Sequence, residues 1–149
     1  MPALPHLMFS APEPWMVGVA ADAGEALAKN LATVCTRSGF ECSAPDLWRD
    51  VGWEFQASRD GDAFSIRFAK YRERSVLLAA PPAEYSSYFG GSDPIPRAET
   101  GTLRAVCAAI HRRISEDGRF ESLSWMLGGP PEKVPQFATY EALPFRDGV

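Results

Sequence analysis

Residues 51–80 have the sequence VGWEFQASRDGDAFSIRFAKYRERSVLLAA, in which apolar and polar side chains alternate on both sides of Asp60-Gly61. This alternation has the period of β-strands that bury one face. Asp-Gly is a preferred pair for a two-residue type I′ turn, because both central residues need a positive φ. Such a turn places three apolar cross-strand pairs on one face, namely Trp53 with Phe68, Phe55 with Ile66 and Ala57 with Phe64.

The opposite face of this hairpin is polar, because Glu54 falls opposite Arg67 and Gln56 falls opposite Ser65. A slip of one residue would expose three aromatic rings, so the pattern and the turn specify the same register. A third strand ends at Pro81-Pro82 and completes a meander over about residues 51–80. With a three-residue loop, Arg72-Glu73-Arg74, its core face carries Val76, Leu78 and Ala80, while Leu77 and Ala79 face the other way. Because both faces are apolar, we expect this strand to lie inside the sheet or to be covered on both sides.

Two amphipathic helices are predicted, over about residues 23–37 and 102–117. Asp22 and Glu25 have capping-box spacing before the first helix, and Gly39 is placed to close it. The second helix has a buried stripe at helical spacing, made of Leu103, Val106, Cys107, Ile110 and Ile114. A last strand is predicted near 120–127. We therefore expect an α+β fold, with both helices packed on the face that carries the aromatic rings of the meander.

The chain is predicted to form a single domain over residues 1–149. Its N-terminus, about residues 1–14, contains four prolines and suggests an extended arm in which His6 is exposed. A short strand is possible at Trp15–Ala20. The tail, about residues 128–149, is expected to be irregular, or to form one short helical turn near residues 136–142.

The composition favours a soluble cytoplasmic protein. Hydrophobic residues make up 46% and charged residues 23% of the chain, and the formal net charge is −4. Three cysteines without CxxC spacing indicate reduced thiols. We see neither an apolar run of about 18 residues nor a basic N-terminal region, so we expect no membrane span and no signal peptide.

Only one pair of side chains suggests catalysis. Cys107 and His111 are four residues apart on the second helix, and imidazole can activate a thiol nucleophile. However, Cys107 belongs to the apolar stripe, and a buried cysteine usually acts as a small hydrophobe. The remaining soft ligands, Cys35, Cys42 and His6, match no zinc template. The sequence therefore favours a protein that is not an enzyme and carries no metal or cofactor.

The principal hypothesis is a non-catalytic cytosolic protein-interaction module, such as an adaptor, a chaperone-like protein or an immunity-like protein. Aromatic residues tend to anchor interfaces, and four stand in connections of this chain: Trp48, Tyr85, Tyr88 and Phe89. The order of elements is similar to the layout of bacterial binding modules, including type III secretion chaperones and some toxin-neutralising immunity proteins. That similarity lies in the layout alone, since no motif assigns the chain to a family. We expect a protein partner or self-association.

Two alternatives remain open from the sequence. The first is a small enzyme or ligand-binding domain whose pocket lies between the sheet and the loop at 83–100, with Cys107 and His111 in it. The second is a weak nucleic-acid binder that uses the basic stretch from Arg67 to Arg74. The acidic net charge and the expected pairing of Arg67 with Glu54 argue against nucleic acid.

Overall fold

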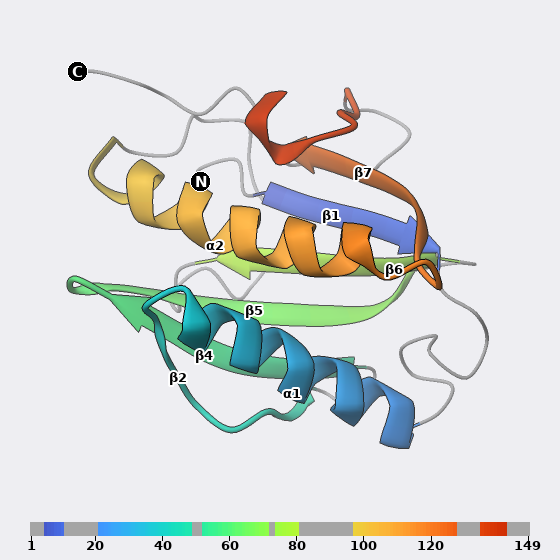
Figure 1. The fold of residues 1–149 in the computed structure, drawn as a ribbon, viewed down its shortest axis with the longest axis horizontal. Coiled ribbons are helices and arrows are strands. Elements are labelled where there is room, and N and C mark those ends of the chain that lie inside the picture. Colours follow the sequence, from blue (N-terminus) through green and yellow to red (C-terminus); the bar gives the residue numbers. More distant parts are fainter. Residues whose placement is uncertain are drawn as a thin grey trace.

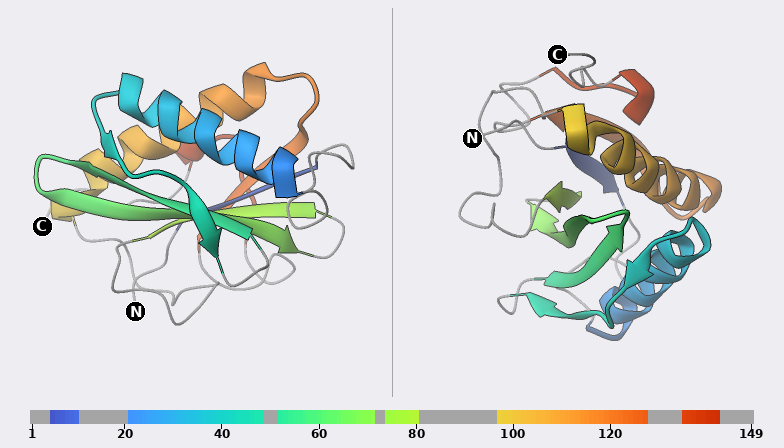
Figure 2. Two further views of the ribbon diagram at one scale, coloured as in Figure 1. Left: turned by 90° about the horizontal axis from the view of Figure 1, so that it is seen from below. Right: turned by 90° about the vertical axis from the view of Figure 1, so that its left-hand side faces the viewer.

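A single antiparallel sheet with two helices on one face forms the described part of the chain (Figures 1 and 2). The computed structural model describes residues 5–10, 21–48, 52–71, 74–80, 97–127 and 135–142. Within these ranges the elements are β1 (Pro5–Ser10), α1 (Ala21–Arg37), β2 (Glu41–Cys42), β3 (Asp46–Trp48), β4 (Gly52–Arg59), β5 (Asp62–Tyr71), β6 (Arg74–Ala80), α2 (Arg97–Glu116), β7 (Glu121–Leu127) and the 3-10 helix η2 (Tyr140–Ala142). The strand order is β2-β4-β5-β6-β1-β7, and β3 also pairs with β4. The predicted α+β class, with both helices on one face, is confirmed.

The hairpin of β4 and β5 has the predicted register. Trp53 pairs with Phe68, Phe55 with Ile66 and Ala57 with Phe64. The turn residues have positive φ, 53° at Asp60 and 85° at Gly61, as a type I′ turn requires. On the opposite face Arg67 Nε donates to Glu54 Oε2 at 2.7 Å, and Ser65 Oγ donates to Gln56 Oε1 at 3.0 Å.

The predicted facing of the third strand is wrong by one residue. In β6, Leu77 pairs with Phe68 and Ala79 pairs with Ile66, so Leu77 and Ala79 belong to the main core. Val76 lies on the other face, in a small buried cluster with Met8 and Met126. The reason is that Tyr71 pairs with Arg74, which leaves two residues rather than three between the strands. A change of one residue in loop length reverses the facing of the whole strand. The strand does lie inside the sheet, between β5 and β1.

The N-terminal residues do not form a loose arm over their described part. Pro5–Ser10 is strand β1, which lies between β6 and β7 (Figure 1). Its Leu7 and Phe9 enter the main core, and His6 is fully buried on the other face, so the expected exposure of His6 is wrong. Proline is compatible here, since Pro5 is the first residue of the strand. The strand suggested for Trp15–Ala20 lies outside the described residues.

The helices begin earlier than the sequence predicts, at Ala21 and Arg97. Gly101, just before the predicted start at about residue 102, lies inside α2, where an exposed glycine costs only about 1 kcal/mol. The end of α1 is as predicted: Gly39 has φ 94°, its N–H donates to Thr36 O at 3.1 Å, and Phe40 N–H donates to Cys35 O at 3.1 Å. This pair of bonds is the Schellman motif. It brings the buried Phe40 against the core and starts the edge of the sheet at β2.

The turn after α2 is organised by the carboxylate of Asp117. This carboxylate accepts hydrogen bonds from Arg119 Nη2 at 2.7 Å, from the Arg119 backbone N–H at 3.1 Å and from Arg113 Nη1 at 3.2 Å. Arg113 Nε in turn donates to Asn30 Oδ1 on α1. The network therefore joins both helices to the start of β7.

We predict that Asp117→Asn lowers stability at neutral pH and loses that effect in acid. The Arg119 side chain, followed by the Arg119 backbone and the Arg113 side chain, holds the pKa of Asp117 well below its ordinary 3.8. A carboxyl with a depressed folded pKa stabilises the fold above its unfolded pKa and loses this contribution as the pH falls. Urea midpoints of both proteins should therefore differ at pH 7, and the difference should shrink progressively as the pH falls below about 3.8, the unfolded pKa. An equal difference at all pH values would contradict the assigned network.

We also predict that Gly52→Ala destabilises the protein strongly. A Cβ at Gly52 would lie 2.0 Å from the Phe68 carbonyl oxygen and 2.9 Å from Ala69 Cβ, so the central hairpin would have to separate. Overpacking of this kind costs about 1–3 kcal/mol or more. The matched control is Gly101→Ala, where nothing lies within 4 Å and the helix should gain about 0.5–1 kcal/mol. Urea denaturation measures both changes, and a neutral Gly52→Ala would contradict the close approach of β4 and β5.

Candidate functional site

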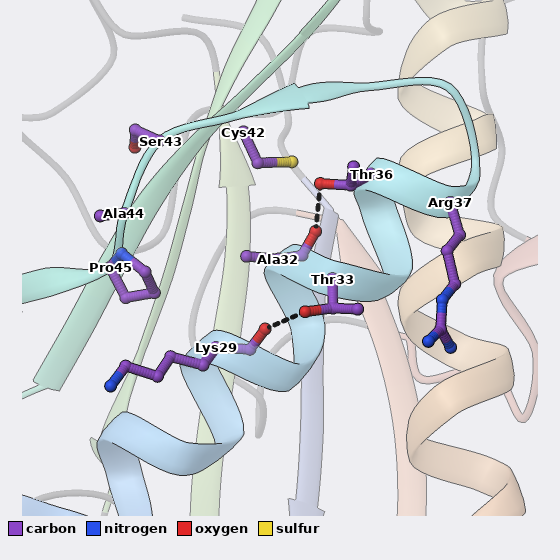
Figure 3. A pocket seen from close by; sticks show the side chains of 9 residues that line it. All are labelled: Lys29, Ala32, Thr33, Thr36, Arg37, Cys42, Ser43, Ala44 and Pro45. Carbon is purple, nitrogen blue, oxygen red and sulfur yellow. Dashed lines mark hydrogen bonds between the residues drawn. The ribbon is translucent and has the colours of Figure 1, made fainter.

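A groove of about 660 Å³ lies between the C-terminal half of α1 and the segment after β2 (Figure 3). Helix residues form one wall and the edge of the sheet forms the other. The residues that line it are Lys29, Ala32, Thr33, Thr36, Arg37, Cys42, Ser43, Ala44 and Pro45. Two of them are cationic and none is acidic, in a chain of net charge −4.

The edge-strand wall is held in place by Ser43. Its backbone N–H donates to Gln56 O at 2.9 Å, and its Oγ accepts from the Gln56 N–H at 2.8 Å. The hydroxyl thus takes the place of a backbone carbonyl, and the chain leaves the ladder at Ala44 and Pro45 before β3 rejoins β4. Because the two short strands pair with opposite ends of β4, the segment between them is fixed beside α1.

The threonines on the helix wall present acceptors to the groove. Thr33 Oγ1 donates to Lys29 O and Thr36 Oγ1 donates to Ala32 O, each at 2.9 Å. Each hydroxyl hydrogen is therefore used within the protein, by a helix carbonyl and, for Thr36, also by the Cys42 thiol, so that oxygen lone pairs remain for a ligand. A ligand of this wall has to bring hydrogen-bond donors.

The side chains of the two cations extend in different directions. Lys29 extends from α1 toward Pro45, whereas Arg37 leaves the last turn of the helix in the opposite direction (Figure 3). Lys29 Nζ pairs with Glu25 Oε1 at 2.9 Å, and the Lys29 side chain is 66% exposed. An exposed pair of this kind contributes at most about 1 kcal/mol, so a ligand carboxylate can compete with Glu25 for the ammonium.

An apolar side chain stands next to the groove. Leu47, in β3, is 52% exposed. Among the residues whose side chains the structure describes, it is the large hydrophobic residue that is exposed. It pairs with Trp53, which places it on the same face of the sheet as α1. The backbone of this edge is blocked at two points, since Pro45 lacks an N–H and Asp46 Oδ1 accepts from the Leu47 N–H at 2.8 Å. Side chains rather than strand pairing must therefore bind a ligand here.

All three cysteines are free thiols, and they differ in burial. Burial raises the pKa of Cys35 to about 12 and raises the pKa of Cys107 well above its ordinary range. Cys42, in the groove, is half-buried; burial raises its pKa as well, while a hydrogen bond with Thr36 acts in the opposite direction. None of the three is an activated nucleophile near neutral pH.

The Cys107 and His111 pair does not form the arrangement that catalysis would need. Cys107 is fully buried in the core, and His111 Nδ1 instead accepts a hydrogen bond from Trp125 Nε1 at 3.0 Å. Burial lowers the pKa of His111, although Glu141 acts in the opposite direction. The imidazole is therefore neutral at pH 7 and its Nδ1 is already in use.

The four aromatic residues predicted to bind a partner remain predictions. Trp48 lies at the end of β3, directly after Leu47, and the placement of its side chain is not described. Tyr85, Tyr88 and Phe89 lie outside the described residues, as does most of the loop at 83–100 beside which an alternative pocket was expected. The positions of these side chains relative to Cys107 and His111 therefore lie outside what the structure describes.

Sequence reasoning missed the groove. Lys29, Thr33 and Thr36 follow helical spacing i, i+4, i+7, so a polar stripe on α1 could have been recognised. The opposite wall, Cys42–Pro45, carries no sequence signal, because its position beside α1 depends on the pairing of β2 and β3 with β4.

No protein-family model matches the chain, and neither a curated protein nor a solved structure is detectably similar to it. Among the described residues, no three His, Cys, Asp or Glu side chains are grouped to hold a metal ion. The helices described are too short or too polar to cross a membrane.

We predict that alkylation of the folded protein reaches Cys42 first and leaves Cys107 unmodified. Thr36→Val should slow the reaction of Cys42 further, because it removes the hydrogen bond that lowers the pKa of this thiol. Iodoacetamide labelling followed by peptide mass spectrometry measures all three rates, with urea-unfolded protein as the control. Fast labelling of Cys107 that depends on His111 would contradict the assignment of both residues to structure.

Proposed function

We propose that the chain is a non-catalytic cytosolic protein-interaction domain that binds an extended acidic segment of another protein in the groove beside α1. The observation that carries the proposal is the lining of this groove, which combines two cations with acceptor hydroxyls and contains no carboxylate. The chain as a whole has the opposite sign, with a net charge of −4.

The hydroxyl groups favour a peptide over a simple anion. Thr33 and Thr36 can only accept hydrogen bonds from a ligand, because their hydrogens are bonded to helix carbonyls. Backbone N–H groups of a peptide satisfy such acceptors, whereas a fully ionised inorganic anion cannot. The oxygen of Ser43 accepts from Gln56, so its own hydrogen is left to donate to a peptide carbonyl.

The placement of charge favours an extended ligand. Lys29 extends toward Pro45 and Arg37 extends in the opposite direction, so one compact anion would contact only one of them (Figure 3). A segment with carboxylates some distance apart can pair with both cations. Exposed charges of this kind contribute more to the association rate and to specificity than to affinity.

Leu47 supplies the apolar contact that the charged ends lack. It is exposed on the helix face of the sheet, next to Pro45, and one large side chain of a partner could cover it. Trp48 follows Leu47 in the same edge strand, and we keep it as a candidate anchor together with Tyr85, Tyr88 and Phe89.

Observations at the other candidate sites weigh against the two alternatives. Cys107 is buried with a raised pKa, and His111 is bonded to Trp125, which leaves neither free for catalysis. Arg67, the first residue of the basic stretch, is buried and paired with Glu54 rather than presented to nucleic acid. Three free thiols suit the reducing cytosol.

The test is a peptide array that samples acidic, neutral and basic short sequences, each with and without leucine, probed with the labelled protein. We expect retention of acidic peptides that contain leucine, and weaker binding as salt is raised. Lys29→Glu should reduce affinity by about fivefold, because the change loses an exposed ion pair worth up to about 1 kcal/mol and replaces it with repulsion.

Arg112→Glu is the matched control, since Arg112 is exposed on α2 away from the groove and makes the same change in net charge. Equal effects of the two variants, or selection of basic peptides, would refute the proposal. The remaining possibility is that the groove binds a second copy of the chain, which light scattering of the protein alone detects. A dimer that Leu47→Asp dissociates would identify a second copy of the chain, and not an acidic segment of another protein, as the occupant.

A further inference from the structure

The short segment at residues 135–142 is attached to β7 through one residue, Trp125. The backbone N–H of Trp125 donates to Phe137 O, and the N–H of Phe137 donates to Trp125 O, both at 2.8 Å. This is an isolated bridge rather than a strand of the sheet. Because one pair of bonds cannot hold a segment firmly, the attachment depends on side chains.

Those side chains form a cluster of three rings from three elements. His111 of α2 lies 6.2 Å from the ring centre of Trp125 and 5.7 Å from that of Tyr140, which belongs to η2. Trp125 and Tyr140 are in edge contact at 6.4 Å. His111 thus lies between the strand and the segment, and the Trp125 indole is fixed by its bond to His111 Nδ1 at 3.0 Å.

This bond requires one protonation state of His111. An indole N–H can only donate, so Nδ1 has to be the nitrogen that carries no hydrogen. In the imidazolium both nitrogens carry hydrogen, and Nδ1–H would then face the indole N–H. Proton uptake by His111 therefore replaces a hydrogen bond with a contact between two donors at the centre of the cluster.

We propose that His111 is a pH-sensitive latch, which holds residues 135–142 on β7 while it is neutral and releases them when it is protonated. Release uncovers the backbone N–H and C=O of Trp125, which then belong to an open sheet edge. It also removes Tyr140 and Glu141 from one side of a cavity of about 420 Å³, whose opposite side is formed by Ala105 and Ala108 of α2.

The charged and titratable neighbours of the cluster set the direction of the response. Glu141 of η2 favours the imidazolium, whereas burial disfavours it more, so the pKa of His111 is lowered from 6.5. Arg112 and Cys107 of α2 lie near the Tyr140 hydroxyl, and burial raises the pKa of that phenol. The pKa of His111 therefore lies below 6.5, and its protonation sets in as the pH falls below that value.

The direction of the pH dependence follows from the linkage between protonation of His111 and attachment of residues 135–142. The released state binds the proton with the ordinary pKa near 6.5, and the attached state binds it less readily. Attachment is therefore at full strength above about pH 6.5 and weakens as the pH falls. Uptake of one proton changes the ratio of released to attached molecules at most tenfold per pH unit, and only below the released-state pKa of 6.5. The 1.5 units from there to pH 5.0 therefore allow a rise of up to about 30-fold relative to pH 7.5.

Amide hydrogen exchange by NMR tests the latch. We expect the protection factors of the Trp125 and Phe137 amides, corrected for intrinsic exchange, to fall between pH 7 and pH 5. The amides paired between β4 and β5 should keep theirs and provide the internal control. The indole N–H resonance of Trp125, assigned with Trp125→Phe, should shift with the same midpoint below 6.5. Protection that does not change with pH, or a midpoint above 6.5, would overturn the proposal.

Two variants separate His111 from the other histidine. His111→Gln keeps an acceptor for the indole but cannot take up a proton in this range, so the pH dependence should vanish. If it persists, a group other than His111 is responsible and the latch is refuted. Glu141→Gln removes the charge that raises the pKa of His111 and should move the midpoint to lower pH. A midpoint that stays in place or rises would also overturn the assignment, even if His111→Gln does not fold.

Discussion

The register of the β4–β5 hairpin determines most of this structure. Two positive φ values at Asp60 and Gly61 set the twist and length of the turn, and the turn aligns the apolar residues as cross-strand pairs on one face. Because that face is apolar, the two helices cover it and share one core with its rings. The position of α1, and therefore the groove beside it, follows from a two-residue turn.

The two edges of the sheet are protected in different ways, and both proposals concern these edges. On the β2 and β3 side, the Ser43 hydroxyl, the imide of Pro45 and the Asp46 carboxylate interrupt the backbone groups that another strand would pair with. Protection there is permanent, so recognition has to use side chains. On the β7 side, protection rests on a single bridge to Phe137 and on the neutral state of His111. Protection there can be reversed by one proton.

The reactive and charged side chains of the described core mainly stabilise the fold. Cys35 and Cys107 fill the core between the helices and the sheet, where burial keeps their thiols protonated. The ion pair of Glu54 and Arg67 joins β4 to β5 on the face away from the helices. His111 is the exception, since its hydrogen bond from Trp125 requires the neutral imidazole.

The sequence by itself determined the elements whose partners are near in the chain. The turn at Asp60-Gly61, the pairing of Trp53 with Phe68, the end of α1 at Gly39 and the stripe of α2 all rest on local periodicity and backbone preference. Tertiary structure alone decided the rest. β1 inserts between β6 and β7, and Trp125 bonds to His111, so both contacts join residues that are not neighbours in the chain. The groove wall at residues 42–45 depends on the pairing of β2 with β4. The facing of Leu77 changed with one residue of loop length. Local patterns specify which face of an element is apolar. Long-range pairing decides which elements meet, and the periodicity of the sequence carries no information about that pairing.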